Sequence, residues 1–552
     1  MNKFDNNRNK KPRGAVDGFI GGGNSGSRNP VKKTQVYQPR TVASNTSLGN
    51  FGNTDGFHGK SSSNIKAGTH PLGRQSLRDG TTGQIALDMP AASARSKRGT
   101  QIKKPFWKNI GAKKAAIALL LVILIGGGFL FGNAYLKARQ VLKGGGGAAA
   151  LEGNVDPSKL RGEGDGRVNI LMLGKGGAGH EGADLTDTLL IVSIDPVQKE
   201  AAILSIPRDF YVKTTDHGSM KINAVYAMAK NEVLSGKKTS DQKSRAEDAG
   251  FKAVEKTIEQ TIGIPIHYHS MVDFEGFKKA IDTVGGVDIN VTTAVSEQMR
   301  IDGRNYKLDV KTGQQHFDGF RALAYSRSRH TSARGDFDRS ERQRAIMVAL
   351  KDKTLSLGTL GNPMKINQLI NEFGGHVQTN LSVDELLAVY GVMKQIDNSK
   401  IQSIGLADPP NILVTTTNLN GQSVVIPKAG LNNYKEIQNY IRNKLRDGYL
   451  ANENASVAIY NGTYTAGLAA RTAEELKSYG YNVTTVADAP NKGYSATTIV
   501  DLRNGSKKYT RRYLEQRFKT SMTSNIPDTS IAAGSADFVI ILGQNEVSRL
   551  ED

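Results

Sequence analysis

An uncharged apolar run of 17 residues, Ala115–Phe131 (AAIALLLVILIGGGFLF), divides this chain of 552 residues into two unlike parts. Continued through Leu136, the run passes 20 residues, the length that a helix needs to cross about 30 Å of hydrocarbon. A signal peptide would begin near residue 1, whereas this run begins after residue 114 and lacks a small-x-small cleavage site. The sequence therefore predicts a transmembrane helix over 114–136 that is not cleaved.

Basic residues flank this segment on both sides. Five lysines lie in the stretch before it, KKPFWKNIGAKK, and Lys137, Arg139 and Lys143 follow it. The positive-inside tendency places the more basic side in the cytoplasm. We therefore expect a single-pass protein of the cell membrane with a cytoplasmic N-terminus and with its C-terminal domains outside the cell. The lack of cysteine fits an exported chain and excludes disulfides and thiolate metal sites.

The net charge of +21 belongs to the N-terminal end. Residues 1–150 carry 24 Lys and Arg against five Asp, which leaves a net charge of +2 for the remaining 402 residues. The folded part therefore lacks the basic surface typical of nucleic-acid binding. Residues 1–110 have no apolar period, and we expect a disordered basic cytoplasmic tail that is either simply solvated or an arm for anionic lipid headgroups or partner proteins. The glycine-rich residues 137–165 predict a flexible linker.

Strands alternate with helices from residue 166 onward. VNILMLG, TLLIVSID, AAILSI, IHYHSMV and GGVDINV are short apolar runs of the strand type. FKAVEKTIEQTIG and FEGFKKAIDTV have helical spacing, and 339–357 is a longer helical stretch. The alternation predicts an α/β fold over 166–360, an αβα sandwich with helices on both faces of the sheet. Residues 361–450 are either an extension of this domain or a linker.

A second, smaller α/β domain is predicted over 454–547. ASVAIYNGT indicates a strand and a turn, and AGLAARTAEELKSYG indicates a helix closed by Gly480. YNVTTVADA and ADFVIILG indicate two further strands. The chain is therefore expected to carry two folded domains after its membrane helix.

Four polar clusters interrupt the strands and helices of the first domain. They are GKGGAGHEGADLTDT (174–188), SIPRDFYV (205–212), MKIN (220–223) and YSRSRHTSARGDFDRSERQRA (325–345). All but the third lie at the ends of predicted elements, where open α/β sheets place their sites. The last cluster holds six arginines, whose guanidinium forks match phosphate oxygens.

The helical period sorts the arginines of the last cluster. Arg339 and Gln343 share a helix face with Ile346, which must point at the core. We therefore expect Arg339 and Gln343 on the inward face, where an arginine implies an anion, and Arg344 in solvent.

The residues before this helix suggest further parts of the same site. Arg327 and Arg329 lie two apart, so on an extended segment they project to one side. Asp336 and Asp338 precede the helix, where a carboxylate caps its N-terminus or orients an arginine.

Simpler roles fit several of these residues as well. Arg208 and Asp209 fit a structural ion pair, Asp187 fits a turn cap, and the arginines fit a solvated face. GKGGAG lacks the Lys-Ser/Thr of a phosphate-binding loop, and His267 and His269 lack a third zinc ligand. No Gly-x-Ser-x-Gly elbow is present.

Taken together, these clusters resemble the LytR–CpsA–Psr (LCP) family of cell-wall glycopolymer transferases. The matching pieces are NILMLG, LTDT, SIPRD, KIN, DFEGFKKAIDTVGGVDINV and LAYSRSR followed by DFDRSERQ. The resemblance covers 166–350 or more, and VAIYNGTYTAGLAARTAEELKSYGYNV is similar to the LytR C-terminal domain. It implies that 166–360 is the LCP catalytic domain and 454–547 a LytR C-terminal domain.

The resemblance implies an arginine-rich pocket for a diphosphate and Mg²⁺ (or Mn²⁺). The implied pocket residues are Arg208, Lys221, Arg327, Arg329, Asp336, Arg339 and Gln343. Asp187 matches a carboxylate near the metal, and Asp184 is a further candidate ligand. Asp209 or Asp336 would orient an arginine or accept a proton from the acceptor.

One part of the family pattern is missing. The family carries an Asp and an Arg in the loop after the first strand and an Arg two residues before the position of Asp187. Here Gly176 or Gly177 and Leu185 stand at those places. Either the loop residues His180, Glu181 and Asp184 take over, or metal binding and activity are weaker.

The implied activity is transfer of a glycopolymer with its phosphate from a polyprenyl pyrophosphate carrier to peptidoglycan. Three alternatives compete with it: a non-catalytic scaffold that binds wall or lipid carrier, a polyprenyl-pyrophosphate pyrophosphatase, and a transcriptional attenuator. The near-neutral charge of the part beyond the predicted membrane helix disfavours the attenuator.

Overall fold

The computed structural model describes residues 147–152, 155–180, 182–234, 239–330, 332–356, 373 and 375–551. The predicted cytoplasmic tail and the predicted membrane helix over 114–136 lie outside these ranges. Among the helices that are described, none is long and apolar enough to cross a membrane.

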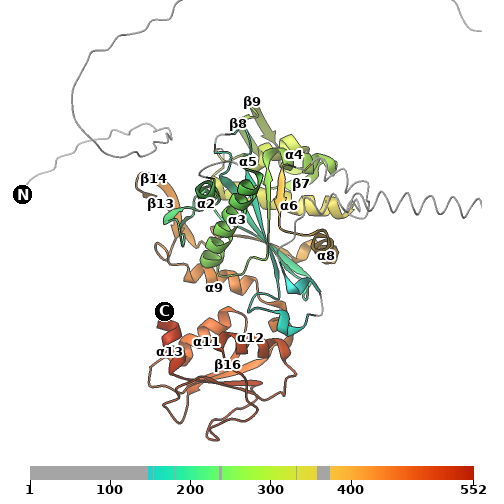
Figure 1. Ribbon diagram of the computed structural model, residues 1–552. Coiled ribbons are helices and arrows are strands. Elements are labelled where there is room, and N and C mark those ends of the chain that lie inside the picture. The colour runs from blue at the N-terminus through green and yellow to red at the C-terminus, as the bar shows by residue number, and fades with distance from the viewer. Residues whose placement is uncertain are drawn as a thin grey trace, which may run out of the picture. The chain divides into compact units, whose positions relative to one another are not determined.

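A mixed sheet of six strands forms the centre of the first domain (Figure 1). Its strands in spatial order are β11 (Val377–Thr379), β6 (Tyr268–Asp273), β1 (Val168–Lys175), β2 (Thr186–Asp195), β3 (Glu200–Ser205) and β12 (Ile401–Gly405). The pairs β1–β2 and β2–β3 are antiparallel, whereas β1–β6 and β3–β12 are parallel. The end of β1, the start of β2 and the end of β3 therefore meet at one edge of the sheet.

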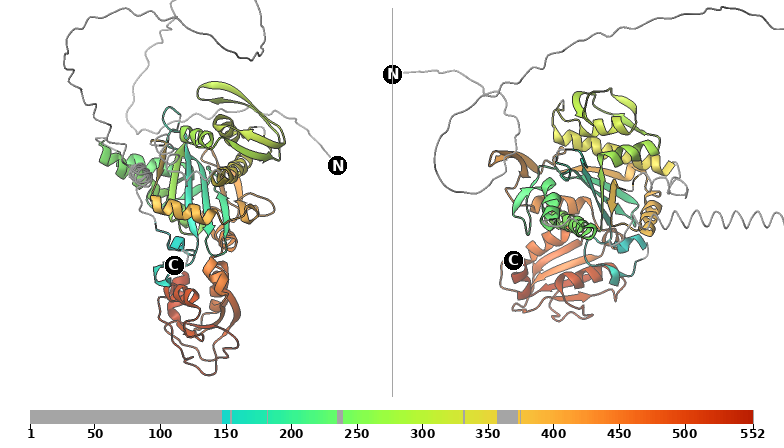
Figure 2. Two further views of the ribbon diagram at one scale, coloured as in Figure 1. Left: turned by 90° about the vertical axis from the view of Figure 1, so that its right-hand side faces the viewer. Right: turned by 45° about the horizontal axis from the view of Figure 1, so that its top comes forward.

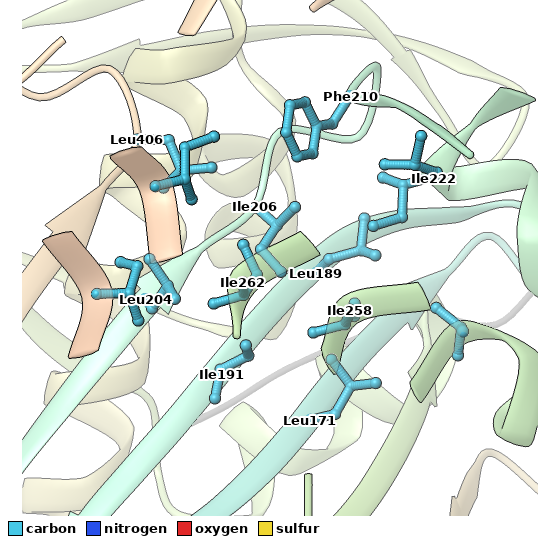
Figure 3. Close-up of a cluster of buried hydrophobic side chains, with 14 of the residues drawn as sticks. Leu171, Leu189, Ile191, Leu204, Ile206, Phe210, Ile222, Ile258, Ile262 and Leu406 are labelled. Carbon is cyan, nitrogen blue, oxygen red and sulfur yellow. The ribbon is translucent and has the colours of Figure 1, made fainter. Parts of the chain in front are cut away.

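Helices cover both faces of this sheet. On one face, β1, β2 and β3 pack against α2 (Val225–Val233), α3 (Ser240–Ile262) and α9 (Lys435–Lys444). Figure 3 shows Leu171, Leu189 and Leu204 of the strands with Ile258 and Ile262 of α3. The opposite face packs against α8 (Val383–Met393), and α6 (Asp336–Ser356) lies on β3 and β12. The mixed α/β fold is thus confirmed, with an αβα layer order.

A smaller cluster of elements adds a second core to this domain. It comprises α4 (Phe274–Thr283), β7 (Val287–Val291), β8 (Val295–Ile301), β9 (Arg304–Val310), β10 (Gly313–Phe317) and α5 (Gly319–Arg327). The β8–β9 hairpin, visible in Figure 2, turns at Asp302 and Gly303, which both have positive φ. Two positive φ values in a two-residue turn match the twist of a hairpin. Two short hairpins complete the domain: β4 (Tyr211–Lys213) with β5 (Ser219–Lys221), and β13 (Val414–Leu419) with β14 (Gln422–Pro427).

Residues 377–445 belong to the first domain, so residue 360 is not its end. They supply β11 and β12, the two edge strands of the central sheet, and α9, whose Ile437 and Ile441 are buried in the main core. The linker interpretation of 361–450 is therefore wrong for this part. These strands are only three and five residues long, too short for a periodic signal in the sequence.

The stretch predicted as a flexible linker is also packed where it is described. Ala148 and Ala150 lie in the core on the α8 face of the sheet, and Val155 and Leu160 are each 1 % exposed. The flexible-linker prediction for 137–165 is therefore wrong for these described residues. A run of alanines next to glycines has the composition of a flexible linker, yet Ala148 and Ala150 pack in the core against the sheet.

The C-terminal part is a four-stranded α/β domain. Its sheet has the order β16 (Asn482–Asp488), β15 (Ser456–Asn461), β18 (Phe538–Leu542) and β17 (Thr498–Asp501). Its helices are α11 (Leu468–Ser478), α12 (Lys508–Phe518) and α13 (Gln544–Glu551), and α10 (Gly448–Glu453) precedes it. Gly480 follows α11 with φ of 99° and ends the helix, as predicted.

Two expectations for the arginine-rich stretch are overturned. Arg344 does not face solvent: it is 2 % exposed and donates to Ser205, to Ser403 and to Asp408. Arg327 is the last residue of α5 and not part of an extended segment. The prediction assumed that α6 buries only the face that carries Arg339 and Ile346. It was wrong for Arg344 because α6 packs on β3 and β12 as well as on α5 and β7.

The buried position of Arg344 leads to a stability prediction. Arg344→Ala removes the guanidinium 2.7 Å from Asp408 and leaves the buried hydroxyl of Ser205 and the exposed hydroxyl of Ser403 without their donor. We expect a loss of about 2–4 kcal/mol of unfolding free energy, since Asp408 keeps some contact with solvent. Urea unfolding followed by circular dichroism measures it. The control Arg245→Ala removes an exposed ion pair and should change stability by less than about 0.5 kcal/mol; equal effects in both would contradict the buried role.

Candidate functional site

A cavity of about 890 Å³ opens at the edge of the central sheet where β1 and β3 end and β2 begins. The loop after β1 contributes Gly176 and His180, and the start of β2 contributes Asp187. The segment after β3 contributes Arg208, and the first turns of α6 contribute Arg339 and Gln343. Three of the four polar clusters seen in the sequence therefore converge on one cavity.

Positive charge dominates the lining of this cavity. Among the described residues, the lining includes three carboxylates, Asp187, Glu297 and Asp302, and a larger set of guanidiniums. The guanidiniums are those of Arg208, Arg300, Arg327, Arg329 and Arg339.

Asp336, in the first turn of α6, ties three of these arginines together. Its carboxylate lies 3.2 Å from Arg208 Nε, 3.2 Å from Arg339 Nη1 and 3.8 Å from Arg329 Nη1. Burial opposes ionisation of Asp336, but the charges of Arg339, Arg208 and Arg329 outweigh it and lower its pKa. Asp336 is therefore an ionised group that orients guanidiniums, and its low pKa makes it a poor proton acceptor.

Arg327 differs from these three arginines, because its charge is not paired with an acid among the described residues. Its Nη1 is buried and has no hydrogen-bond partner, and no carboxylate in the described part of the chain lies within ion-pair distance. Its guanidinium stacks on the ring of Phe274, 4.7 Å from the centroid. Burial lowers its pKa, against the attraction of Asp302 and Asp187. A guanidinium that lines a cavity, has a buried unpaired nitrogen and lacks a paired anion is a strong indication of an anionic ligand.

Arg339 adds a second incompletely satisfied cation. It is 7 % exposed, and its Nε is buried without a hydrogen-bond partner. Burial lowers its pKa; Asp336 raises it, and Arg208 and Arg329 lower it further. The inward position predicted from the helix period is what the structure has.

Gln343, Arg208 and Asp187 lie beside these arginines. Gln343 Nε2 donates to Thr188 Oγ1 at 3.0 Å, which links α6 to β2. Arg208 Nη1 donates to Asp187 Oδ1 at 3.1 Å, and Asn223 Nδ2 donates to the same oxygen at 3.1 Å. The acids Asp187, Asp336 and Asp209 around Arg208 raise its pKa although burial lowers it.

Four predicted residues, Lys221, Asp209, Asp184 and Asp336, are not among the residues that line the cavity. Lys221 pairs with Asp209 at 2.9 Å, behind Arg208, so both support the site from outside its lining. Asp184 accepts from Lys175 and Lys230, each at 2.9 Å, and lines a separate cavity. The structure therefore does not bring Asp184 together with Asp187.

The described residues do not form a complete protein cage for a metal ion. No group of three or more His, Asp or Glu in that part of the chain is arranged to hold one. Asp187 Oδ1 is already engaged, which leaves Oδ2 as its ligand atom. Mg²⁺ is often bound by one or two protein carboxylates, with its other ligands supplied by substrate phosphates and water. The residues present fit Mg²⁺ in this mode.

Glu297 is a site residue that sequence reasoning missed. It comes from β8, is 5 % exposed, and its Oε2 accepts from Ser328 Oγ at 2.7 Å and from the backbone N–H groups of Arg329 and His330 at 2.9 and 3.2 Å. On the other side, Arg342 Nη2 donates to the Ser328 carbonyl and to Ser332 Oγ. These two buried charges hold the segment that carries Arg329.

The sequence offers a weak signal for this role. VSEQMRI and RNYKLDV, joined by a two-residue turn, have the pattern of a hairpin, and Glu297 occupies one of its inward positions. The same hairpin brings Arg300 and Asp302 to the cavity. Nothing in the sequence pairs this hairpin with Ser328–His330, which is a contact across 32 residues.

The fold and the cavity together define an α/β domain suited to hold a multiply charged anion such as a diphosphate. The chain belongs to the LytR_cpsA_psr family, whose model matches residues 133–439. A second model, described as LytR cell envelope-related transcriptional attenuator, matches residues 454–545.

Named relatives support this membership. The chain is 28 % identical over 442 residues to the cell wall biosynthesis protein LcpA of Corynebacterium glutamicum, covering 73 % of this chain and 80 % of that protein. It is 31 % identical over 303 residues to the polyisoprenyl-teichoic acid–peptidoglycan teichoic acid transferase TagV of Bacillus subtilis, covering 53 % of this chain and 68 % of that protein. A crystal structure of B. subtilis TagV matches at 29 % identity and a TM-score of 0.39, covering 50 % of this chain and 97 % of that one.

Glu297→Ala should weaken anion binding without touching a guanidinium. The Ser328–His330 segment loses a charged acceptor of three hydrogen bonds, so Arg329 is no longer held in place. We expect pyrophosphate to bind about 10-fold or more weakly by calorimetry. Glu275→Ala removes an acid that is 49 % exposed and serves as the control. Unchanged pyrophosphate affinity in Glu297→Ala would show that the segment holds its position unaided.

Asp336→Asn should change the pH dependence of stability. A carboxyl with a lowered pKa contributes stability above its unfolded-state pKa of about 3.9, and this contribution is lost as the pH falls through the lower folded-state value. The wild type should therefore exceed Asp336→Asn in unfolding midpoint at pH 5–7, and the difference should shrink below about pH 4. Asp216→Asn, at an exposed position, is the control. A difference in unfolding midpoint that stays constant from pH 7 to pH 3 would contradict a stabilising role of the ionised Asp336 carboxylate.

Proposed function

We propose that this protein is a membrane-anchored transferase that moves a glycopolymer, with its linking phosphate, from a polyprenyl pyrophosphate carrier to peptidoglycan. The observation that carries the proposal is the group of arginines that line the cavity with too few acids, above all Arg327, whose buried Nη1 is unpaired, and the buried Arg339. The relatives TagV and TagU, whose names state teichoic acid transfer to peptidoglycan, support the same reaction.

The reaction assigned to the cavity is a displacement at phosphorus. A hydroxyl of peptidoglycan attacks the phosphorus that carries the glycan, and the bond from that phosphorus to the bridging oxygen breaks. Polyprenyl phosphate leaves with the bonding electrons, and the hydroxyl proton is released. Charge grows on the bridging oxygen as the bond breaks, and preoriented guanidiniums stabilise it there.

The site residues either bind the diphosphate or hold in place the arginines that bind it. Arg327, Arg329 and Arg339 bind the diphosphate, and Arg208, from the segment after β3, joins them. Asp336 orients Arg208 and Arg339, and Gln343 fixes the distance between α6 and β2. Asp209 and Lys221 keep Arg208 in position from behind.

A divalent cation completes the proposal. Asp187 would hold Mg²⁺ (or Mn²⁺) together with phosphate oxygens, and the cation would neutralise charge on the diphosphate. Asp184 is not part of this set, because two lysines already neutralise it.

The anchor follows from the sequence and from the substrate. The predicted helix over 114–136 would hold the catalytic domain at the outer face of the cell membrane, where a polyprenyl carrier presents its cargo. This arrangement keeps enzyme and lipid substrate at the same surface.

Loss of a single guanidinium should abolish most of the transfer. The full-length protein is incubated with a labelled lipid-diphosphate glycan, peptidoglycan fragments and Mg²⁺, and label on peptidoglycan is measured. We expect Arg327→Ala and Arg339→Ala to reduce the rate at least about 100-fold, because each removes a group that stabilises charge in the transition state. Arg245→Ala, on the exposed side of α3, should transfer at the wild-type rate.

Three other outcomes would redirect the assignment. Tight binding of the lipid without turnover favours a scaffold. Release of free glycan phosphate in the presence of peptidoglycan favours a pyrophosphatase. Full transfer by Arg327→Ala contradicts the role of the unpaired guanidinium.

A further inference from the structure

A second cavity of about 370 Å³ lies on the other side of the loop that follows β1. The loop passes between the two cavities, and Ala178 lines both of them. At Gly177, with φ of 83°, an added Cβ would lie 2.9 Å from the Cβ of Asp273. The loop that separates the two cavities is therefore narrow at Gly177, because any larger residue there would collide with Asp273.

The ionisable groups of the second cavity are paired with one another. Lys175 Nζ lies 2.9 Å from Asp184, which also accepts from Lys230. His376 Nδ1 lies 2.9 Å from Asp273 Oδ2. None of the described residues that line this cavity is an arginine. It therefore lacks the excess positive charge that suits the first cavity to a diphosphate.

Two hydrogen-bonding atoms of the lining remain unused within the described part of the chain. Gln378 Oε1 is buried without a partner, while its Nε2 donates to Glu247 at 3.0 Å. His376 uses Nδ1 for Asp273, so Nε2 is the ring nitrogen left for a ligand. The Asp273–His376 pair also supports the start of α4, because Asp273 Oδ1 accepts from the N–H of Gly276. That structural role does not account for Gln378 Oε1.

We propose that this second cavity binds an uncharged sugar unit through Gln378 and His376, next to the diphosphate held in the first cavity. Balanced charges and unused polar atoms suit hydroxyl and amide groups, which donate and accept without carrying charge. The volume falls in the lower part of the range of small-ligand sites, roughly 300–1,000 Å³. The source of the sugar rests on the proposed function: it belongs either to the peptidoglycan acceptor or to the glycan attached to the diphosphate.

The test uses two variants that keep the local structure. His376→Asn retains a side-chain N–H for Asp273 and removes Nε2, and Gln378→Met removes Oε1 from a chain of similar length. The probe is chitotetraose, a neutral oligomer of N-acetylglucosamine, with the full-length protein in detergent. Calorimetry and saturation-transfer NMR measure its binding. We expect both variants to bind it about 10-fold or more weakly and to bind pyrophosphate as the wild type does.

Arg339→Ala is the matched control, since it should lose pyrophosphate and keep chitotetraose. Chitotetraose that fails to bind the wild type overturns the proposal. So does binding that both cavity variants leave unchanged, and so does binding that falls equally in Arg339→Ala. Because no step of the test needs turnover, a wild type that binds sugar without transferring label refutes the proposed function and leaves the sugar site in place.

A competition arm identifies the source of the sugar. Farnesyl diphosphate fills the first cavity without a sugar and should leave chitotetraose bound. If farnesyl diphosphate that carries N-acetylglucosamine displaces chitotetraose, the sugar of the donor occupies the second cavity. If both bind together, the second cavity belongs to the acceptor.

Discussion

Asp336 holds three arginines that two distant parts of the chain supply, and the cavity takes its shape from that contact. Arg208 follows β3, whereas Arg329 and Arg339 flank the start of α6. Three guanidiniums around one carboxylate repel each other unless a further anion joins them. Asp187 and Asp209 also pair with Arg208, whereas Arg329 and Arg339 have only Asp336 among the described residues. The contact between α6 and the segment after β3 therefore depends on Asp336 and on a ligand that supplies the missing charge.

The supports around this contact are buried charges as well. Glu297 and Arg342 hold the Ser328–His330 segment from opposite sides, and Arg344 fixes α6 to the serines of β3 and β12. Arg339 and Arg344 lie on different faces of α6 and serve different purposes. Arg344 has a full set of partners and stabilises the fold, whereas Arg339 has an unsatisfied Nε and faces the cavity. Burial does not separate these two arginines, because both are buried; they differ in that Arg339 lines the cavity and keeps an unpaired Nε.

Local patterns in the sequence predict the fold class and the inward position of Arg339 and Gln343, whereas Asp187 and Arg208 were implied by the family resemblance. Apolar runs of six to ten residues indicate β1, β2 and β3, and the helical period places Arg339 and Gln343 inward. Edge strands of three and five residues carry too few side chains for a period, so β11 and β12 were missed. Glu297 was missed for a different reason: its partners lie 31 to 33 residues away, and no spacing rule joins a hairpin to a later loop.

The two cavities divide the chemistry of a glycan diphosphate between them. A guanidinium cluster with an excess of positive charge binds phosphate strongly but gives little hold on a neutral sugar, whose hydroxyls need both donors and acceptors. A cavity with internally paired charges, such as that of Lys175, Asp184, Asp273 and His376, has the opposite preference. The loop between them must be thin for one ligand to span both or for two ligands to meet. Gly177 meets that requirement, because any side chain there would collide with Asp273. A glycine at position 177 therefore keeps the loop that separates the two cavities narrow where it passes Asp273.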